Sequence, residues 1–139
     1  MVNETRKEGF LEGLRANGLK PEEADIYMDC KERTDVEHAV EDCLRSQADC
    51  IICMDDRICS NALEKLKSGG IVIPEQIRVA SFYDSILLEN SLPAVTSLRY
   101  DPRNLGVVAA KNLFRLIAEE AVEEITYLDY EVALKGSTQ

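Results

Sequence analysis

The segment CIICMDDRIC, residues 50–59, brings three cysteines, two aspartates and an arginine together within ten positions of the chain. Cysteine thiolates bind metal ions, paired carboxylates can transfer protons, and polar groups at the end of an apolar run can bind a small ligand. Each of these chemistries requires its own spacing and its own supporting elements.

A metal site at Cys50 and Cys53 is disfavoured by the strand that the surrounding apolar run predicts. The two cysteines have the spacing of a zinc knuckle, but residues three apart on a strand point to opposite faces. A structural zinc ion takes four nitrogen or sulfur ligands, and the sequence has no second CxxC pair. The single histidine, His38, is predicted in the middle of a helix elsewhere. We therefore expect no metal, and we expect the cysteines to pack as small hydrophobic residues in a reduced core.

Acid–base chemistry would require Asp55 and Asp56 to face one another, and neighbouring side chains in extended backbone diverge. We predict that Asp56 caps the following helix, where a carboxylate accepts from free N–H groups, and that Asp55 faces a cleft. A small α/β enzyme that uses Asp55 remains an alternative. The sequence lacks a Gly-x-Ser-x-Gly elbow, a Walker loop and a Gly-x-Gly-x-x-Gly motif, so no cofactor is expected.

The composition predicts a soluble domain that does not itself touch nucleic acid. The 139 residues are 45% hydrophobic and 30% charged, with a formal net charge of −10, which phosphate groups would repel. Apolar runs stay well short of the roughly 18 residues that span a membrane, and the first ten residues lack a signal-peptide core. The five cysteines suit a reducing compartment, so we expect a cytoplasmic protein without a membrane partner.

Helical and strand patterns alternate along the chain. Predicted helices run from Asn3 or Thr5 to Asn17-Gly18, from a capping box at Thr34–Glu37 to Leu44, over 57–70, and over 104–122 after Asp101-Pro102. Predicted strands cover 24–29, 48–54, 77–84, 94–100 and 125–134. The run 48–54 is almost wholly apolar, which is typical of a strand buried on both faces. The alternation predicts an α/β fold, a three-layer sandwich around a parallel sheet.

Ligands of such sheets bind beyond the carboxyl ends of the strands. Asp55 and Asp56 follow one predicted strand, Tyr83 and Asp84 end another, and Tyr100 ends a third. The three strand ends are therefore predicted to converge on one cleft that binds a small polar ligand.

Six motifs along the chain resemble those of the lactose-repressor (LacI/GalR) family of transcriptional regulators. They are RKEGF (6–10), MDDRICSNA (54–62), GIVIPEQIRV (70–79), SFYD (81–84), PAVTSL (93–98) and the spaced LG and AA pairs within 105–110. They resemble, in that order, Arg-x-x-Gly-Phe, Asn-Asp-x-x-Ala-x-Gly-Ala, Gly-x-x-Val-Pro-x-Asp-Ile-x-Val, Gly-Phe-Asp-Asp, Pro-Pro-Leu-Thr-Thr-Val and Leu-Gly-x-x-Ala. The resemblance covers nearly the whole chain.

The resemblance implies a truncated type I periplasmic-binding-protein subdomain. Residues 1–99 and 126–139 would form the C-terminal subdomain, residues 100–125 would be a return segment of the other subdomain, and the helix-turn-helix DNA-binding head would be absent. The helix predicted at 104–122 would normally cover a sheet that is also absent. We therefore expect a neighbouring chain, or local repacking, to cover its apolar face.

The resemblance also implies four ligand-binding residues. Arg6 matches an arginine that reaches the effector, and Asp55 stands where an asparagine often binds it. Tyr83 replaces a ligand-binding aspartate, and Tyr100 matches a cleft position near the hinge. Ser81 stands in place of the usual glycine. Arg57 follows the aspartate pair and could contact either that pair or the ligand. These replacements argue against assuming a typical sugar.

The function implied is the effector-binding and dimerisation region of a bacterial transcriptional regulator, with DNA bound only through the absent head. The predicted helix at 58–66 and the segment SILLENSL (85–92) are candidates for a homodimer interface, with local core packing as the alternative. A sugar-binding protein for transport or chemosensing, with the same fold, is the alternative function.

Overall fold

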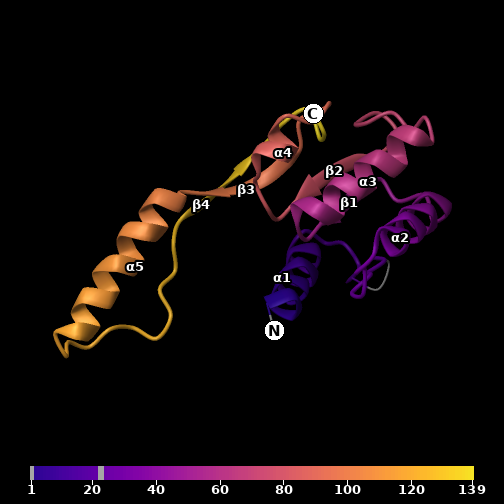
Figure 1. Cartoon of the computed structure of the whole chain (residues 1–139). Helices are drawn as coiled ribbons and strands as arrows, with labels where there is room; N and C mark the ends of the chain where they lie inside the picture. Colours follow the sequence, from indigo (N-terminus) through magenta and orange to yellow (C-terminus); the bar gives the residue numbers. More distant parts are fainter. Residues whose placement is uncertain (1, 22–23) are drawn as a thin grey trace.

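The chain folds around a four-stranded sheet whose first three strands are parallel. A computed structural model describes residues 2–21 and 24–139 (Figure 1). The strands β1 (Cys50–Cys53), β2 (Arg78–Ser81), β3 (Thr96–Tyr100) and β4 (Tyr130–Ala133) lie in that order, and β4 runs antiparallel to β3. The predicted α/β class with a mainly parallel sheet is confirmed.

Five helices are formed by the described residues: α1 (Val2–Ala16), α2 (Arg33–Arg45), α3 (Asp56–Ser68), α4 (Ile86–Glu89) and α5 (Pro102–Ile117). The helix α1 begins at Val2, before either predicted start, and it ends just before Gly18, whose φ of 73° suits a helix terminator. The helix α2 also begins earlier than predicted, because Glu32 rather than Thr34 is its N-cap and Asp35 Oδ2 accepts from the Glu32 N–H at 2.8 Å.

The predicted strand at 24–29 is wrong. Among the described residues of that range, none forms a strand, and β1 is the edge strand of the sheet. A strand exists only where a neighbouring strand supplies backbone hydrogen bonds. An apolar–polar pattern alone therefore did not suffice here.

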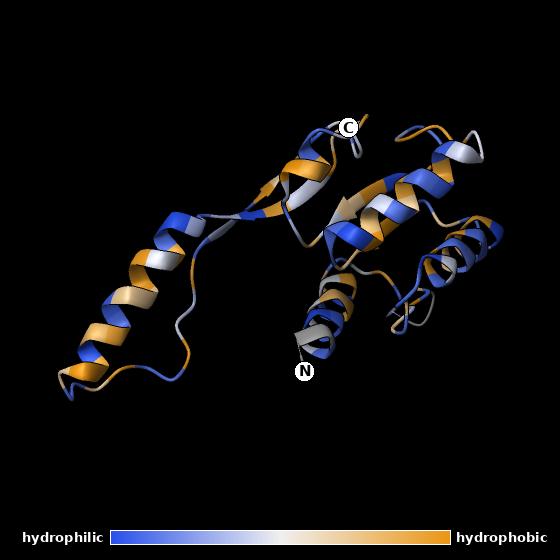
Figure 2. Ribbon diagram, in the orientation of Figure 1, coloured by the Kyte–Doolittle hydropathy of each residue, from blue (hydrophilic) through white to orange (hydrophobic). Residues whose placement is uncertain are grey.

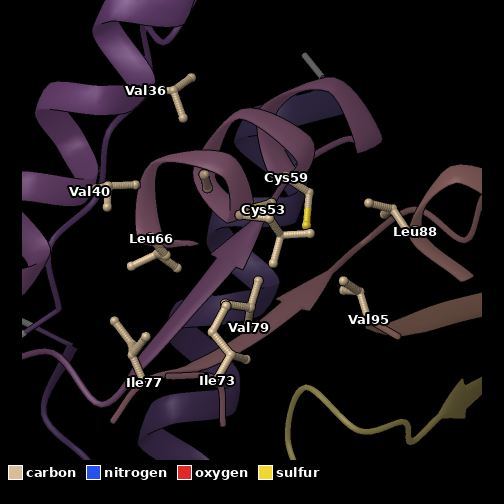
Figure 3. Close-up of a cluster of buried hydrophobic side chains, with 12 residues drawn as sticks. Val36, Val40, Cys53, Cys59, Leu66, Ile73, Ile77, Val79, Leu88 and Val95 are labelled. Atoms are coloured by element: carbon tan, nitrogen blue, oxygen red, sulfur yellow. The ribbon is translucent and has the colours of Figure 1, made fainter. Parts of the chain in front are cut away.

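The core lies between one face of the sheet and the helices α2 and α3 (Figure 3). On α3, Ala62 and Leu66 are buried and Ile58 is partly buried. The buried apolar residues are Val36, Val40, Cys53, Cys59, Ala62, Leu63, Leu66, Ile73, Ile77, Val79, Leu88 and Val95. The prediction that β1 is buried on both faces is wrong: Cys50 is exposed and Ile52 is 42% exposed, because α2 and α3 cover the opposite face.

The C-terminal segment connects β2 and β3 by hydrogen bonds just upstream of the point where the two strands begin to pair directly. The pairing of β2 with β3 starts at Ala80 and Thr96, and Ser137 fills the gap upstream. The Ser137 carbonyl accepts from the Val79 N–H at 3.1 Å, and its N–H donates to the Ala94 carbonyl at 3.0 Å. Its hydroxyl accepts from the Thr96 N–H at 2.9 Å and donates to the Val79 carbonyl. Ser137 is fully buried.

The helix α5 stands away from the rest of the chain at the end of the ribbon formed by β3 and β4 (Figure 1). Its predicted cap and proline are confirmed, since Asp101 Oδ1 accepts from the Arg103 and Asn104 N–H groups. Apolar residues cover much of its surface (Figure 2), and no residue between Pro102 and Ile117 is buried. Local repacking of this face, one of the two expected arrangements, is therefore wrong. Across the described ranges, no helix is long and apolar enough to cross a membrane.

Candidate functional site

The carboxyl ends of the parallel strands meet at one edge of the sheet. Tyr83, which follows β2, and Tyr100, which ends β3, lie near enough for the phenol of Tyr100, through its charge and its hydrogen-bonding capacity, to raise the pKa of Tyr83. The charge of Asp56, which follows β1, raises that pKa further. Arg6 of α1 reaches the same region, because its Nη1 donates to the Met54 carbonyl at 3.3 Å. Strand ends far apart in the sequence thus come within interaction range.

The cap that the sequence predicts for Asp56 is formed by Asp55 instead. Asp55, not Asp56, is the N-cap of α3, and its Oδ1 accepts from the Ile58 N–H at 2.8 Å. Asp56 lies in the first turn of the helix, where its negative charge suits the helix dipole. The cap fell one residue earlier than predicted because Asp55 has the extended backbone that an N-cap adopts, with φ −146° and ψ 173°.

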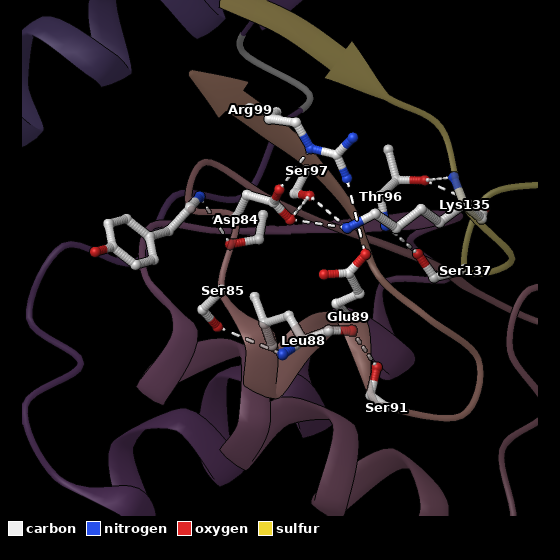
Figure 4. A network of polar contacts seen from close by, with 12 residues as sticks. Asp84, Ser85, Leu88, Glu89, Ser91, Thr96, Ser97, Arg99, Lys135 and Ser137 are labelled. Atoms are coloured by element: carbon white, nitrogen blue, oxygen red, sulfur yellow. Dashed lines mark hydrogen bonds and ion pairs between the residues drawn. The ribbon is translucent and has the colours of Figure 1, made fainter. Parts of the chain in front are cut away.

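Asp84, which the sequence places at a strand end, is the hub of a polar network that no local motif predicts (Figure 4). Its carboxylate accepts from Ser97 Oγ at 2.7 Å, from Lys135 Nζ at 2.8 Å and from Arg99 Nε at 3.0 Å. Burial alone would raise the pKa of Asp84, but these three donors outweigh burial and lower the pKa to about 2. The SFYD motif contained Asp84, whereas the partner Lys135 lies 51 residues away, at a distance along the chain that no local pattern connects.

A pocket of about 340 Å³ opens at this edge of the sheet. It is lined by Tyr83, Asp84, Arg99, Tyr100 and Pro102. A larger open groove of about 580 Å³ lies between α3 and α4, and none of the residues lining it follows a strand directly. The smaller pocket is therefore the candidate site, since it holds two of the four predicted ligand residues. Arg6 and Asp55 are not among the residues that line it.

The cysteines are not arranged for chemistry. Cys53 and Cys59 are buried side by side (Figure 3), and hydrogen bonding with Cys59, together with burial, raises the pKa of the Cys53 thiol well above its ordinary value. A protonated thiol is neither a nucleophile nor a metal ligand. All five thiols are free, and Cys50 is exposed rather than part of the core, contrary to expectation. The described residues contain no cluster suited to a metal ion.

Arg57 contacts neither aspartate, since its Nη1 donates to the Lys31 carbonyl at 2.7 Å.

The two predicted interface segments differ in exposure. In α3 the apolar face is used within the chain, since Leu63 and Leu66 are buried against neighbouring elements. In α4, Leu88 is buried in the core, but Ile86 is 78% exposed and Leu87 is 57% exposed. An exposed apolar surface is therefore present on α4 rather than on α3.

Comparison with known families matches residues 2–138 to the periplasmic binding protein-like domain. The chain belongs to this family. The fold, with its parallel strands and their convergent carboxyl ends, agrees with this assignment. The predicted likeness to LacI-type regulators is confirmed by the relatives that follow.

Catabolite control protein A of Staphylococcus aureus (strain Mu50) is 24% identical over 136 residues, which cover 95% of this chain and 40% of that protein. Among solved structures, a probable maltose operon transcriptional repressor, MalR, of Staphylococcus aureus is 26% identical with a TM-score of 0.84. A LacI family transcriptional regulator of Silicibacter pomeroyi is also 26% identical, with a TM-score of 0.79. The matches cover 99% and 96% of this chain and 49% of each solved chain. This chain therefore spans about half of these relatives or less.

Proposed function

We propose that this chain is the effector-binding and dimerisation region of a LacI-type transcriptional regulator that senses a small sugar-like or nucleoside-like ligand. The observation that carries the proposal is the pocket at the carboxyl ends of the strands, whose lining includes Tyr83 after β2 and Tyr100 at the end of β3. Family membership over residues 2–138 supports the same function. Binding, without turnover, is the expected activity, because Asp55 is occupied as a helix cap.

Within this function, residues 1–99 and 126–139 would form one lobe and residues 100–125 would return to the other. The position of α5 supports this division, because the β3–β4 ribbon carries it away from the core (Figure 1). A ligand held at the strand ends would then touch the base of that ribbon. Regulation would arise because the ligand binds the open and the closed arrangement of the two lobes with different affinities.

Four residues are proposed to contact the effector. Tyr83 and Tyr100 line the pocket, and each is 39% exposed. Arg6 is half-buried beside Met54, where its guanidinium could hold a hydroxyl, carbonyl or carboxylate group. Asp55 uses Oδ1 for its cap, so Oδ2 is the atom that would accept from the ligand.

The proposed partners are a second copy of the chain and, through a separate head, DNA in the cytoplasm. The net charge of −10 supports a separate head, because this surface would repel phosphates. The exposed Ile86 and Leu87 of α4 support contact with another protein surface.

Ligand-induced stabilisation tests the proposed function. The chain would be melted with millimolar sugars, nucleosides and sugar phosphates, since a ligand of the native state must raise its stability. At least one class should raise the melting temperature, and Tyr100→Ala should abolish that rise. Tyr127→Ala is the matched control, because Tyr127 is 88% exposed and does not line the pocket. The proposal fails if no ligand class acts, or if Tyr100→Ala leaves the rise intact.

A further inference from the structure

Two charged residues, Asp84 and Arg99, line the pocket at the strand ends, and both already form ion pairs within the protein. Asp84 accepts from Arg99 at 3.0 Å, from Lys135 at 2.8 Å and from Ser97 at 2.7 Å (Figure 4). A carboxylate with three donors has little capacity left for the hydroxyls of a ligand.

Arg99 is engaged less completely, through one hydrogen bond and two longer ion pairs. Besides its bond to Asp84, its Nη1 lies 3.5 Å from Glu131 Oε1 and its Nη2 lies 4.0 Å from Glu89 Oε1. Three carboxylates therefore surround one guanidinium. A ligand that depends on bidentate bonds from this arginine would have to displace them.

The remaining lining residues all carry rings. Tyr83, Tyr100 and Pro102 contribute two phenol rings and a pyrrolidine ring to the lining of a pocket of about 340 Å³. The phenol of Tyr100 raises the pKa of Tyr83, so the two hydroxyl groups lie near each other. Asp56 does not line the pocket, but its negative charge acts on Tyr83. Flat apolar faces with few polar groups favour a planar ring over a polyol.

We propose that the effector of this site is a planar heteroaromatic ring of the nucleobase type, bound by stacking on Tyr83 and Tyr100, rather than a free sugar. The proposal rests on the effector-binding function proposed above and specifies its ligand. Asp56 would accept a hydrogen bond from an amino group at the ring edge. The charged network of Asp84, Arg99 and Lys135 would hold the two tyrosines in position rather than touch the ligand.

Titration of the full chain by NMR distinguishes a ring from a sugar. Adenosine and ribose form a matched pair of probes, because they share the sugar and differ in the base; glucose and maltose extend the sugar series. Adenosine should bind at least tenfold more tightly than ribose, which is within the range of base stacking on aromatic side chains. The shifted resonances should include the amides of Tyr83 and Tyr100.

Substitutions at Tyr83 separate its ring from its hydroxyl. Tyr83→Phe keeps the ring and should change adenosine affinity by less than about threefold, whereas Tyr83→Ala should weaken binding about tenfold. Tyr83→Asp should weaken adenosine binding and strengthen sugar binding. Tyr127→Ala, at an exposed tyrosine outside the pocket, should change neither. Circular dichroism of each variant confirms that the fold is intact.

The outcomes also separate this inference from the function on which it rests. Equal affinity for ribose and adenosine, or sugar binding that Tyr83→Ala leaves unchanged, overturns the ring preference and leaves effector binding in place. Adenosine shifts confined to the groove between α3 and α4 overturn the proposed site. If none of the probes binds, both the ring preference and the proposed function fail.

Discussion

Asp84 joins three segments of the chain that are distant in sequence. Its carboxylate binds Ser97 and Arg99 on β3 and Lys135 just after β4, while Asp84 itself follows β2. The side chains of Asp84 and Lys135 are only 16% and 12% exposed, so solvent screens this pair much less than a surface ion pair. The residue therefore stabilises the fold and fixes the base of the ribbon.

Asp84→Asn should lower the free energy of unfolding at pH 7 by about 2 kcal/mol. The estimate follows from the shift of its pKa from 3.8 to about 2, at 1.36 kcal/mol per unit. Urea unfolding measures the change. Asp129→Asn, at an exposed aspartate, is the matched control and should change stability by less than about 0.5 kcal/mol. Equal stability of Asp84→Asn and the wild-type protein would contradict the network's role.

The same residue gives the wild-type protein a pH dependence with a definite sign. The folded-state pKa lies below the ordinary value of 3.8, so between the two values the unfolded chain binds the proton more readily. The stabilisation by Asp84 is therefore complete above about pH 5 and is lost as the pH falls towards 2. Unfolding curves of Asp84→Asn should vary less over this range than those of the wild-type protein.

At the scale of single residues, the sequence brought two candidate residues together but did not predict the interactions around them. Tyr83 and Tyr100 line one pocket, because parallel strands end on the same side of a sheet. The cap was assigned to Asp56 but is formed by Asp55, because a cap depends on the backbone angles of one residue. Lys135 was missed, because its ion pair spans 51 residues.

Among the elements, the sequence predicted the strands that have neighbours and the helices that have clear caps. Asp101-Pro102 began α5 as expected, since an N-cap followed by proline is a local signal. Residues 24–29 failed as a strand, because a strand requires a partner that the pattern cannot supply. Ser137 had no sequence signal, because the four backbone groups that it bonds belong to Val79 on β2, to Thr96 on β3 and to Ala94, which precedes β3.

Ser137→Ala should destabilise the chain by about 1–3 kcal/mol, because the buried N–H of Thr96 would lose its acceptor. Amide hydrogen exchange should show faster opening at Thr96 and Val79 than in the wild-type protein. Ser68→Ala removes an exposed hydroxyl that bonds the Lys65 carbonyl, and it should have little effect. Unchanged exchange at Thr96 after Ser137→Ala would refute the fastening of β2 to β3.

For the molecule as a whole, the feature that calls for a partner surface is α5, whose apolar residues are exposed. Leu113, Phe114, Leu116 and Ile117 are between 56% and 70% exposed near its C-terminal end. The helix carries three basic and no acidic residues, whereas the whole chain carries a net charge of −10. An apolar, basic helix is complementary to an acidic surface of another copy, and contiguous exposed apolar residues drive association. We therefore still predict that a neighbouring chain covers the apolar face of α5, since this chain does not cover it.

The isolated chain should therefore self-associate, and Phe114→Asp should shift the equilibrium towards monomer. Phe114 is 70% exposed, and burying a phenylalanine contributes about 1.5–3 kcal/mol, so the dissociation constant should rise at least tenfold. Sedimentation equilibrium over a range of concentrations measures the constant, and raised salt should weaken association if charge contributes. Leu19→Asp introduces the same charge at a residue that is 59% exposed but lies outside α5, and it should leave the constant unchanged. A monomer at every concentration, or an equal effect of Leu19→Asp, would exclude α5 as the contact surface.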